Sequence, residues 1–526
     1  MLGLEAVVAL GVAVLAGTVL ARRARIAPPV LLLVCGLLLG FVPALRQVHL
    51  PSEAVLLLFL PALLYWESLT TSLREIRSNL RAIVLSSTLL VIATAAAVAV
   101  AAHALGMAWG PAWVLGAALA PTDATAVGVL ARTLPRRTLT TLRAESLIND
   151  GTALVVYGLA VGVTVGNDHL GALSVSGRFL LSYGAGALAG LATAWVSTRV
   201  RRRLDDPLLE NLVVLLTPFT AFLLAEAAHA SGVLAVVVCG LIMSQVGPRV
   251  GRADTRQQMT AFWGLATFLL NGALFVLVGL ETQSAVRGLT SVDVARGLLA
   301  VAGVSAVVVG TRFVWLFTTP YVIRALDRRP QQRLRRVGPR GRIVSGVAGF
   351  RGAVSLALAL AVPATTSSGA PFPGRDLIVF VTAGVVTVTL LLGLLLPAVV
   401  RWAGLPRDTS VDEERRLAAT LAAEEALAAL PKTAAELGTD PDVVERTRRE
   451  YEEHLGVLAT DGEDEDEPVR RHDHQYSALR LALLAQKRAT VVRLRDEQRI
   501  DDIVLRHFQT KLDIEEVRLA RREVAD

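Results

Sequence analysis

Residues 111–131 read PAWVLGAALAPTDATAVGVLA, an apolar stretch interrupted near its centre by Pro121, Thr122 and Asp123. A helix that crosses a bilayer needs about 20 mostly apolar residues, so this stretch predicts a membrane span. Pro121 removes a backbone donor and clashes with the preceding turn, and we therefore expect the helix to break there. A broken span exposes carbonyl groups and helix ends at membrane depth, where a cation can bind.

Similar apolar stretches continue on both sides, up to about residue 402. The chain has 526 residues, of which 53% are hydrophobic, whereas a soluble domain needs more polar surface. The sequence therefore predicts an all-α polytopic membrane protein with about thirteen transmembrane helices, two of them broken. The expected spans are residues 3–21, 29–44, 53–67, 82–104, 111–131, 144–165, 178–197, 208–229, 232–246, 260–280, 294–318, 343–363 and 377–402.

Every second loop between these stretches is rich in arginine, as at residues 22–25 and 199–203. Such loops remain in the cytoplasm, so we expect a multi-pass protein of the cell membrane with its N-terminus outside and its C-terminus inside. Because the arginines lie in short loops, the net charge of +7 does not indicate a nucleic-acid partner. Cys35 and Cys239 lie inside apolar stretches and offer no disulfide framework or metal cluster, and we expect no cofactor.

A short internal repeat relates the two halves of the membrane region. Residues 30–38 read VLLLVCGLL, and residues 234–242 read LAVVVCGLI. The loop charges give these copies opposite orientations, which is the pattern of an inverted repeat. Two short apolar runs can also match by chance, but the spacing favours a real repeat because it places both copies in corresponding spans.

The chain changes character after the last apolar stretch. Residues 1–405 form the expected membrane domain, and residues 406–526 form a charged tail rich in Ala, Leu, Glu and Arg. The capping-box pattern Ser-Val-Asp-Glu at 410–413 predicts the start of a helix. The acidic segment 461–468 predicts a linker within a helical cytoplasmic tail.

Ionisable side chains inside the expected spans are the candidate functional residues, because each costs about 2.5–3.5 kcal/mol at the bilayer centre. They are Asp123, Glu145, Asp150, Glu226, Arg312 and Arg351. Asp123 follows the predicted helix break. The alternative is a simple proline kink with an aspartate that extends toward water, but Asp123 lies near mid-span and its side chain is short.

The segment 145–151, ESLINDG, carries the densest group of polar side chains. A spacing of four residues places Ser146 and Asp150 on one helix face, and Glu145 and Asn149 on a neighbouring face. Carboxylate and other oxygen ligands suit hard cations. A carboxylate removed from water also binds a proton more readily, so Asp150 can hold a proton or a cation but not both. The alternative is a structural hydrogen-bond cluster.

Arg351 lies between Gly349 and Gly352, which predicts the second broken span. A membrane arginine needs an acidic partner. We expect Glu145 to pair with Arg351, which leaves Asp150 free for the cation. Structural roles are favoured for three weaker candidates: Glu226, Arg312 and Asn271.

With these motifs, residues 1–405 resemble bacterial Na⁺/H⁺ antiporters of the cation/proton antiporter-1 (NhaP-type) group. The resemblance rests on Thr122-Asp123, on Glu145-Ser146 followed by Asn149-Asp150, and on the segment 349–354, GFRGAV. It implies a mobile core domain, a dimerisation domain, a homodimer and elevator-like alternating access. The partners it implies are Na⁺ (or K⁺ or Li⁺), protons and membrane lipids.

The resemblance also implies roles for individual residues. Asp150 would carry the ion or the proton, and Na⁺ would bind at Asp150 and Asp123. Ser146, Asn149 and the carbonyl of Thr122 would complete the ion site, and Glu145 and Arg351 would form a pair that stabilises the core. Asn149 before Asp150, with lysine confined to the tail, implies electroneutral exchange of one cation per proton. Many relatives have proline after the Thr-Asp motif; Ala124 stands here, so the preference for Na⁺ or K⁺ stays open.

Three other interpretations compete with this one. A K⁺/H⁺ antiporter or a cation channel is the nearest. A membrane enzyme is disfavoured because the sequence contains no GxxxxGK[ST], HExxH or GxSxG motif. A sensor that uses the tail as its output is the third, and ion exchange by a protein without the tail would argue against it.

Overall fold

The computed structural model describes most of the chain. The described residues are 2–24, 28–42, 52–71, 73–123, 136–166, 172–250, 253–288, 291–326, 338–405, 410–459, 468–499, 504–505, 508–509 and 511–517. Nearly all of them lie in helices, and the extended structure among them is an isolated β-bridge between Thr365 and Pro371. The predicted all-α class is therefore confirmed.

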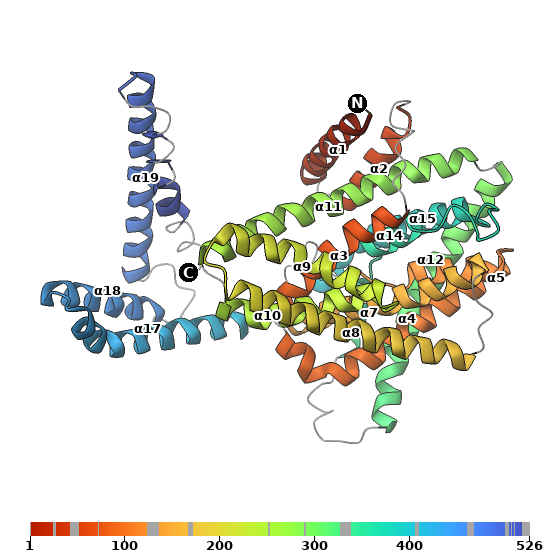
Figure 1. The fold of residues 1–526 in the computed structure, drawn as a ribbon, viewed down its shortest axis with the longest axis horizontal. Coiled ribbons are helices and arrows are strands. Elements are labelled where there is room, and N and C mark those ends of the chain that lie inside the picture. Colours follow the sequence, from red (N-terminus) through yellow and green to blue (C-terminus); the bar gives the residue numbers. More distant parts are fainter. Residues whose placement is uncertain are drawn as a thin grey trace. The chain divides into compact units, whose positions relative to one another are not determined.

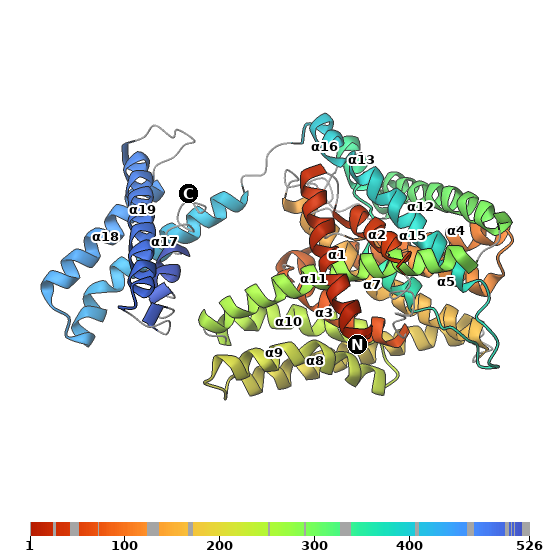
Figure 2. The same ribbon diagram turned by 90° about the horizontal axis from the view of Figure 1, so that it is seen from above.

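The membrane region is a bundle of helices shown in Figure 1. Its first half contains α1 (Leu2–Ala24), α2 (Pro28–Leu39), α3 (Ser52–Thr70), α4 (Leu73–Ala104), α5 (Trp109–Leu119) and α7 (Arg136–Val165). Its second half contains α8 (Ala172–Arg201), α9 (Pro207–Ala227), α10 (Gly232–Val250), α11 (Ala253–Gly288), α12 (Ser291–Leu326), α13 (Pro339–Val347), α14 (Ala353–Leu360), α15 (Arg375–Gly393) and α16 (Leu396–Ala403). Within the bundle, α8, α9 and α10 pack against one another (Figures 1 and 2).

Seven helical segments among the described residues are long and apolar enough to cross a bilayer. They are Val7–Ala24, Ser87–Ala104, Leu142–Val165, Pro207–Ala227, Ala253–Arg287, Val294–Thr319 and Arg375–Gly393. Shorter apolar helices at Pro28–Leu39, Leu57–Thr70 and Gly232–Gly247 coincide with further expected spans. The polytopic membrane fold is confirmed, and the number of thirteen spans stays a prediction.

Two expected spans are interrupted where proline and glycine predict a break. α5 ends at Leu119, and residues 121–123 after it are not helical. Residues 124–131, which were expected to continue this span, lie outside the described residues. The other span divides into α13, which ends at Val347, and α14, which begins at Ala353. The backbone between them is therefore free to approach the end of α5.

The two copies of the sequence repeat lie at close helix contacts. A Cβ atom added to Gly36 of α2 would collide with the backbone of Val276 in α11. A Cβ atom added to Gly240 of α10 would lie 2.6 Å from the Cβ of Ser68 in α3. Small residues let membrane helices approach closely, which explains why glycine stands at both positions.

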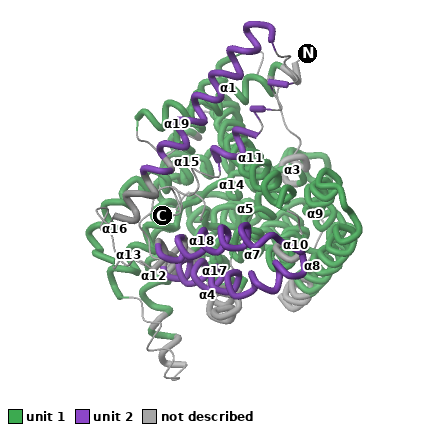
Figure 3. The backbone as a smooth tube through the Cα atoms, turned by 90° about the vertical axis from the view of Figure 1, so that its left-hand side faces the viewer, with its two compact units in different colours: residues 1–408 green, residues 409–526 purple. Residues whose placement is uncertain are grey.

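The chain forms two compact units, residues 1–408 and 409–526, coloured separately in Figure 3. The second unit contains α17 (Ser410–Leu437), α18 (Pro441–Ala459) and α19 (Pro468–Asp496). Leu481, Leu484 and Leu512 form a small apolar cluster there. The expected acidic linker lies almost wholly outside the described residues, because residues 460–467 are not described.

Candidate functional site

The two helix breaks meet inside the membrane unit. The backbone N–H of Asp123, after α5, donates to the carbonyl of Phe350 between α13 and α14, at 2.8 Å. The Asp123 carboxylate lies beside the start of α14, where Oδ2 is 3.4 Å from the backbone nitrogen of Ala353. A helix N-terminus carries partial positive charge, so this position stabilises a negative side chain.

Arg351 binds the end of α5 at the place where the two helix breaks meet, which we call the crossing. Its Nε donates to the carbonyl of Leu119, the last residue of α5, at 3.1 Å, and its Nη1 donates to the carbonyl of Gly349 at 2.6 Å. The side chain is almost fully buried. A helix C-terminus carries partial negative charge and unpaired carbonyls, and the guanidinium group compensates both.

α7 presents its polar side chains to this crossing. The hydroxyl of Ser146 donates to the carbonyl of Thr122 at 2.7 Å. The amide group of Asn149 lies 3.0 Å from the hydroxyl of Thr122. Asp150 is 2% exposed, and its carboxylate accepts no hydrogen bond from any described residue. The four-residue spacing of Ser146 and Asp150 does place both on the face of α7 that meets the break.

A cavity of about 510 Å³ lies beside the crossing, and we call it the Asp150 cavity. Its polar wall comes from α3, the residues that follow α5, α7, α11 and α14. The polar residues are Glu67, Thr70, Thr122, Asp123, Arg143, Ser146, Asp150, Thr267, Asn271 and Ser355. Three carboxylates therefore share the wall with hydroxyl and carbonyl oxygens. Among the described residues, no three acidic, histidine or cysteine side chains lie close enough to form a metal cluster.

Glu67 is a cavity residue that the sequence analysis missed. It lies on α3, and its Oε1 is buried without a hydrogen-bond partner in the described part of the chain. A buried, unpaired carboxylate oxygen is costly and therefore marks a candidate ligand. The available signal was its place in the segment 66–71, WESLTT, inside an apolar stretch but at the expected end of a span.

The expected pair between Glu145 and Arg351 is not what the structure shows. Glu145 Oε1 lies 2.7 Å from Nη1 of Arg312 on α12, and the Arg312 side chain is only 2% exposed. Nε of Arg312 also donates to the carbonyl of Ser345 at 3.1 Å. Arg312 therefore ties α7 to α13, whereas Arg351 is occupied by the carbonyls at the crossing.

Other candidates also lie differently from expectation. In the described part of the chain, Asn149 is fully buried and is not part of the cavity wall, so it lies behind Thr122. Asn271, which was assigned to helix packing, lines the Asp150 cavity. Glu226 lines a different cavity, together with His229.

Comparison with known proteins assigns this chain to a family. The family model described as "Sodium/hydrogen exchanger, transmembrane" matches residues 10–402. The chain belongs to the sodium/hydrogen exchanger family. Members are secondary transporters and not enzymes, and this exchanger is accordingly a multi-pass membrane protein of the cation/proton antiport class.

Individual relatives agree with this assignment. An uncharacterized Na⁺/H⁺ exchanger of Mycobacterium tuberculosis is 50% identical over 98% of this chain and 96% of its own. The low-affinity Na⁺/H⁺ antiporter NhaS1 of Synechocystis is 31% identical over 73% of this chain and 70% of its own. The structure of the sodium proton antiporter MjNhaP1 from Methanocaldococcus jannaschii matches with a TM-score of 0.56 at 20% identity, covering 77% of this chain and 98% of that one. This last likeness concerns the fold.

Proposed function

We propose that this exchanger moves Na⁺, or another small monovalent cation, against protons, and that the two compete for Asp150. The observation that carries the proposal is the position of this carboxylate. It is almost fully buried, it lines a cavity, and it accepts no hydrogen bond from the described residues. A buried carboxylate without a partner must be neutralised, and either a proton or a cation can do so.

The oxygens around Asp150 match a hard monovalent cation. Asp123 and Glu67 supply negative charge, while Ser146 and the carbonyl of Thr122 supply neutral oxygens. Such oxygen ligands bind hard cations. Asn149 holds Thr122 from behind in this scheme and acts as a positioning residue. Na⁺ would bind at Asp150 and Asp123, with Glu67 as an additional acidic group.

Competition at a single carboxylate couples the two fluxes. When a cation occupies Asp150 the proton is displaced, and when a proton occupies it the cation is released. If only Asp150 changes its proton, one cation moves per proton and exchange is electroneutral. The amide at Asn149 supports this ratio, because it replaces a second titratable group with a neutral one. Alternating access within a homodimer would carry Asp150 from one side of the cell membrane to the other.

Proteoliposomes with an imposed pH gradient test the proposal. We expect Na⁺, Li⁺ or K⁺ added outside to dissipate the gradient in the wild type, and the three rates to rank the cations. Asp150→Asn removes the competing charge at almost unchanged volume, so exchange should fall to the level of protein-free liposomes. Asp254→Asn is the matched control, because Asp254 is an exposed residue of α11 and should not affect the rate.

Either of two results would overturn the proposal. Full exchange by Asp150→Asn would exclude this carboxylate as the carrier. A wild type without cation-dependent proton flux for any of the three ions would reopen the sensor and enzyme interpretations. A voltage-sensitive dye tests the stoichiometry, because electroneutral exchange generates no membrane potential.

A further inference from the structure

Arg143 brings a positive charge into the wall of the Asp150 cavity. It lies on α7, three residues before Ser146 and seven before Asp150, and all three residues line the cavity. Residues at these spacings share one face of a helix. The helical rise places Arg143 about 10 Å from Asp150 along the axis of α7. A cavity that is proposed to bind cations therefore carries a fixed cation of its own.

Arg143 stands opposite an excess of negative charge. Among the described residues that line the cavity, it is the only one with a positive charge, whereas Glu67, Asp123 and Asp150 are carboxylates. Its charge acts on Glu67, but its guanidinium group forms no hydrogen bond or ion pair with a described residue. Arginine stays charged at every physiological pH. The ionised wall thus has a net charge of about −2 with Arg143 and about −3 without it.

The other buried arginines near the site do not share this role. Arg351 binds the carbonyls of the crossing, and Arg312 pairs with Glu145. Neither of them lines the cavity. An ion inside the cavity therefore meets its positive charge at Arg143.

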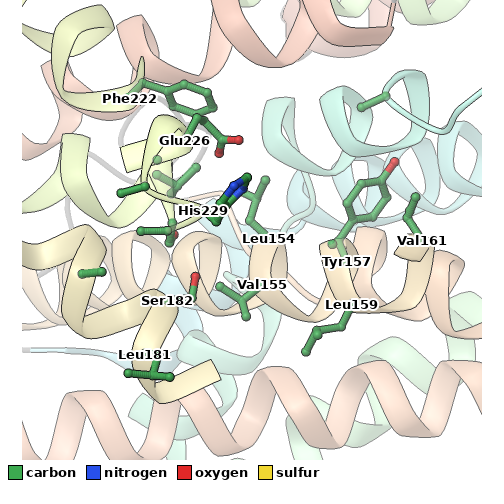
Figure 4. A pocket seen from close by; sticks show the side chains of 18 of the residues that line it. Leu154, Val155, Tyr157, Leu159, Val161, Leu181, Ser182, Phe222, Glu226 and His229 are labelled. Carbon is green, nitrogen blue, oxygen red and sulfur yellow. The ribbon is translucent and has the colours of Figure 1, made fainter. Parts of the chain in front are cut away.

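A second cavity, of about 940 Å³, offers a comparison (Figure 4). It contacts α7 from Leu154 to Val161, beyond Asp150. The described part of its wall holds a single carboxylate, that of Glu226, and no arginine or lysine. The cavity with three carboxylates contains an arginine, and the cavity with one does not. The position of Arg143 thus coincides with the excess of acidic groups.

The charge of the wall decides how well ions of different valence bind. Carboxylate, hydroxyl and carbonyl oxygens are also the ligands of Ca²⁺. The Coulomb energy between Arg143 and a bound ion is proportional to the charge of the ion, so a divalent cation is repelled twice as strongly as a monovalent one. Specificity is a difference of affinities, and repulsion of the wrong ligand is one way to produce it.

We propose that Arg143 is a charge-selectivity residue, whose guanidinium group favours monovalent over divalent cations in the Asp150 cavity. The inference rests on the proposed exchange at Asp150 and names the class of ion that this site rejects. Na⁺ and the proton have the same charge, so Arg143 weakens the binding of both alike and leaves their competition unchanged. A divalent cation such as Ca²⁺ experiences the repulsion twice.

The charge dependence gives a quantitative prediction for Arg143→Gln. Loss of a unit charge at this range should raise the affinity for Na⁺ by roughly three- to ten-fold, and the affinity for Ca²⁺ by the square of that factor. The KM for Na⁺ should fall, and the inhibition constant of Ca²⁺ should fall further. The ratio of Ca²⁺ affinity to Na⁺ affinity should therefore rise by roughly three- to ten-fold. The measurement is Na⁺-dependent proton flux in proteoliposomes, with Ca²⁺ as inhibitor at constant ionic strength.

Three further variants separate charge from structure. Arg143→Lys keeps the charge and should retain the wild-type ratio. Arg202→Gln removes an exposed arginine that follows α8, outside the cavity wall, and should also leave the ratio unchanged. Thr70→Lys adds a positive charge to the wall from α3 and should lower the ratio, which tests the inference even if Arg143→Gln does not fold. A merely structural role of Arg143 would change the melting temperature and both affinities by one common factor.

A binding measurement separates this inference from the antiport proposal. Line broadening of ²³Na in NMR spectra of the detergent-solubilised protein reports Na⁺ binding without transport, and added Ca²⁺ reverses it by displacement. At saturating Na⁺, half-displacement should need roughly three- to ten-fold less Ca²⁺ in Arg143→Gln than in the wild type. Asp150→Asn should remove the displaceable component, which excludes Ca²⁺ bound by the acidic tail.

Two results would refute the role of Arg143. One is an equal ratio of Ca²⁺ to Na⁺ affinity in the wild type and in Arg143→Gln. The other is the same change of this ratio in Arg143→Lys as in Arg143→Gln. A protein that shows the expected shift in binding but exchanges nothing would refute only the antiport.

Discussion

At the scale of single residues, the two buried arginines have different partners. Glu145 pairs with Arg312, and Arg351 caps the carbonyls of the crossing. Removing one partner of a buried pair leaves an uncompensated charge and costs about 3–5 kcal/mol. Arg312→Gln should therefore lower the melting temperature strongly, and adding Glu145→Gln should restore part of the loss.

The same double-mutant cycle with Arg351 is the control for this prediction. Combining Arg351→Gln with Glu145→Gln should give nearly additive losses, because Arg351 bonds to backbone carbonyls. The measurement is thermal unfolding of the purified protein in detergent. A larger coupling between Glu145 and Arg351 than between Glu145 and Arg312 would contradict the arrangement in the structure.

The sequence could predict residues that are related by a helical period, and it failed where the relation is tertiary. Ser146 and Asp150 are four residues apart on one helix, so their common face follows from helix geometry. The partner of Glu145 depends on how α12 and α13 pack. The sequence places both Arg312 and Arg351 inside expected spans and therefore does not distinguish between them. Glu67 was missed for a related reason, since only the packing of α3 against α7 brings it into the Asp150 cavity.

At the scale of helices, the crossing depends on a glycine. A Cβ atom added to Gly352 would collide with the carboxylate of Asp123 and would lie 2.5 Å from its Cγ. Overpacking of this kind costs about 1–3 kcal/mol and displaces the neighbour. Gly352→Ala should therefore abolish or greatly slow cation/proton exchange in proteoliposomes while the protein still folds, because Asp123 must leave the wall of the cavity.

Gly310 of α12 offers the matched control for Gly352. A Cβ atom added there meets nothing within 4 Å. Gly310→Ala should leave exchange unchanged and raise stability slightly, since alanine favours a helix interior over glycine by about 1 kcal/mol. Equal transport rates for the two variants would show that Asp123 adapts and that the tight contact has no functional weight.

The predicted breaks at Pro121 and around Arg351 came from proline and glycine, whose backbone effects are local and readable from sequence. The contact between the two breaks, by contrast, joins residues that are far apart in the sequence, through the hydrogen bond from the N–H of Asp123 to the carbonyl of Phe350. Local sequence patterns do not predict such a contact. The internal repeat also corresponds to tertiary contacts. Gly36 lets α2 pack closely against α11, and Gly240 lets α10 pack closely against α3. An inverted repeat that exchanges α2 with α10 and α3 with α11 would relate these two contacts. Their correspondence supports the repeat more strongly than the nine-residue match does.

At the scale of the whole molecule, the tail is separable from the ion pathway. The Asp150 cavity is lined by residues of the first unit, 1–408, and the tail helices form a unit of their own from residue 409. The carboxylate for which the cation and the proton compete, and the helix breaks that expose carbonyls, all belong to the membrane unit. Nothing in the exchange step as proposed therefore requires a group from the tail.

A protein that ends at residue 408 should consequently retain exchange, with a KM for Na⁺ and a maximal rate within about two-fold of the full chain, an expectation based on the near-additivity of distant independent sites. The full chain and the shortened chain would be compared in proteoliposomes at equal protein content, over a range of pH on each side. Unchanged turnover together with a shifted pH profile would assign the tail to regulation. Loss of turnover in a shortened protein that is still monodisperse and binds ²³Na would mean that the tail takes part in the movement that exposes Asp150 to the two sides.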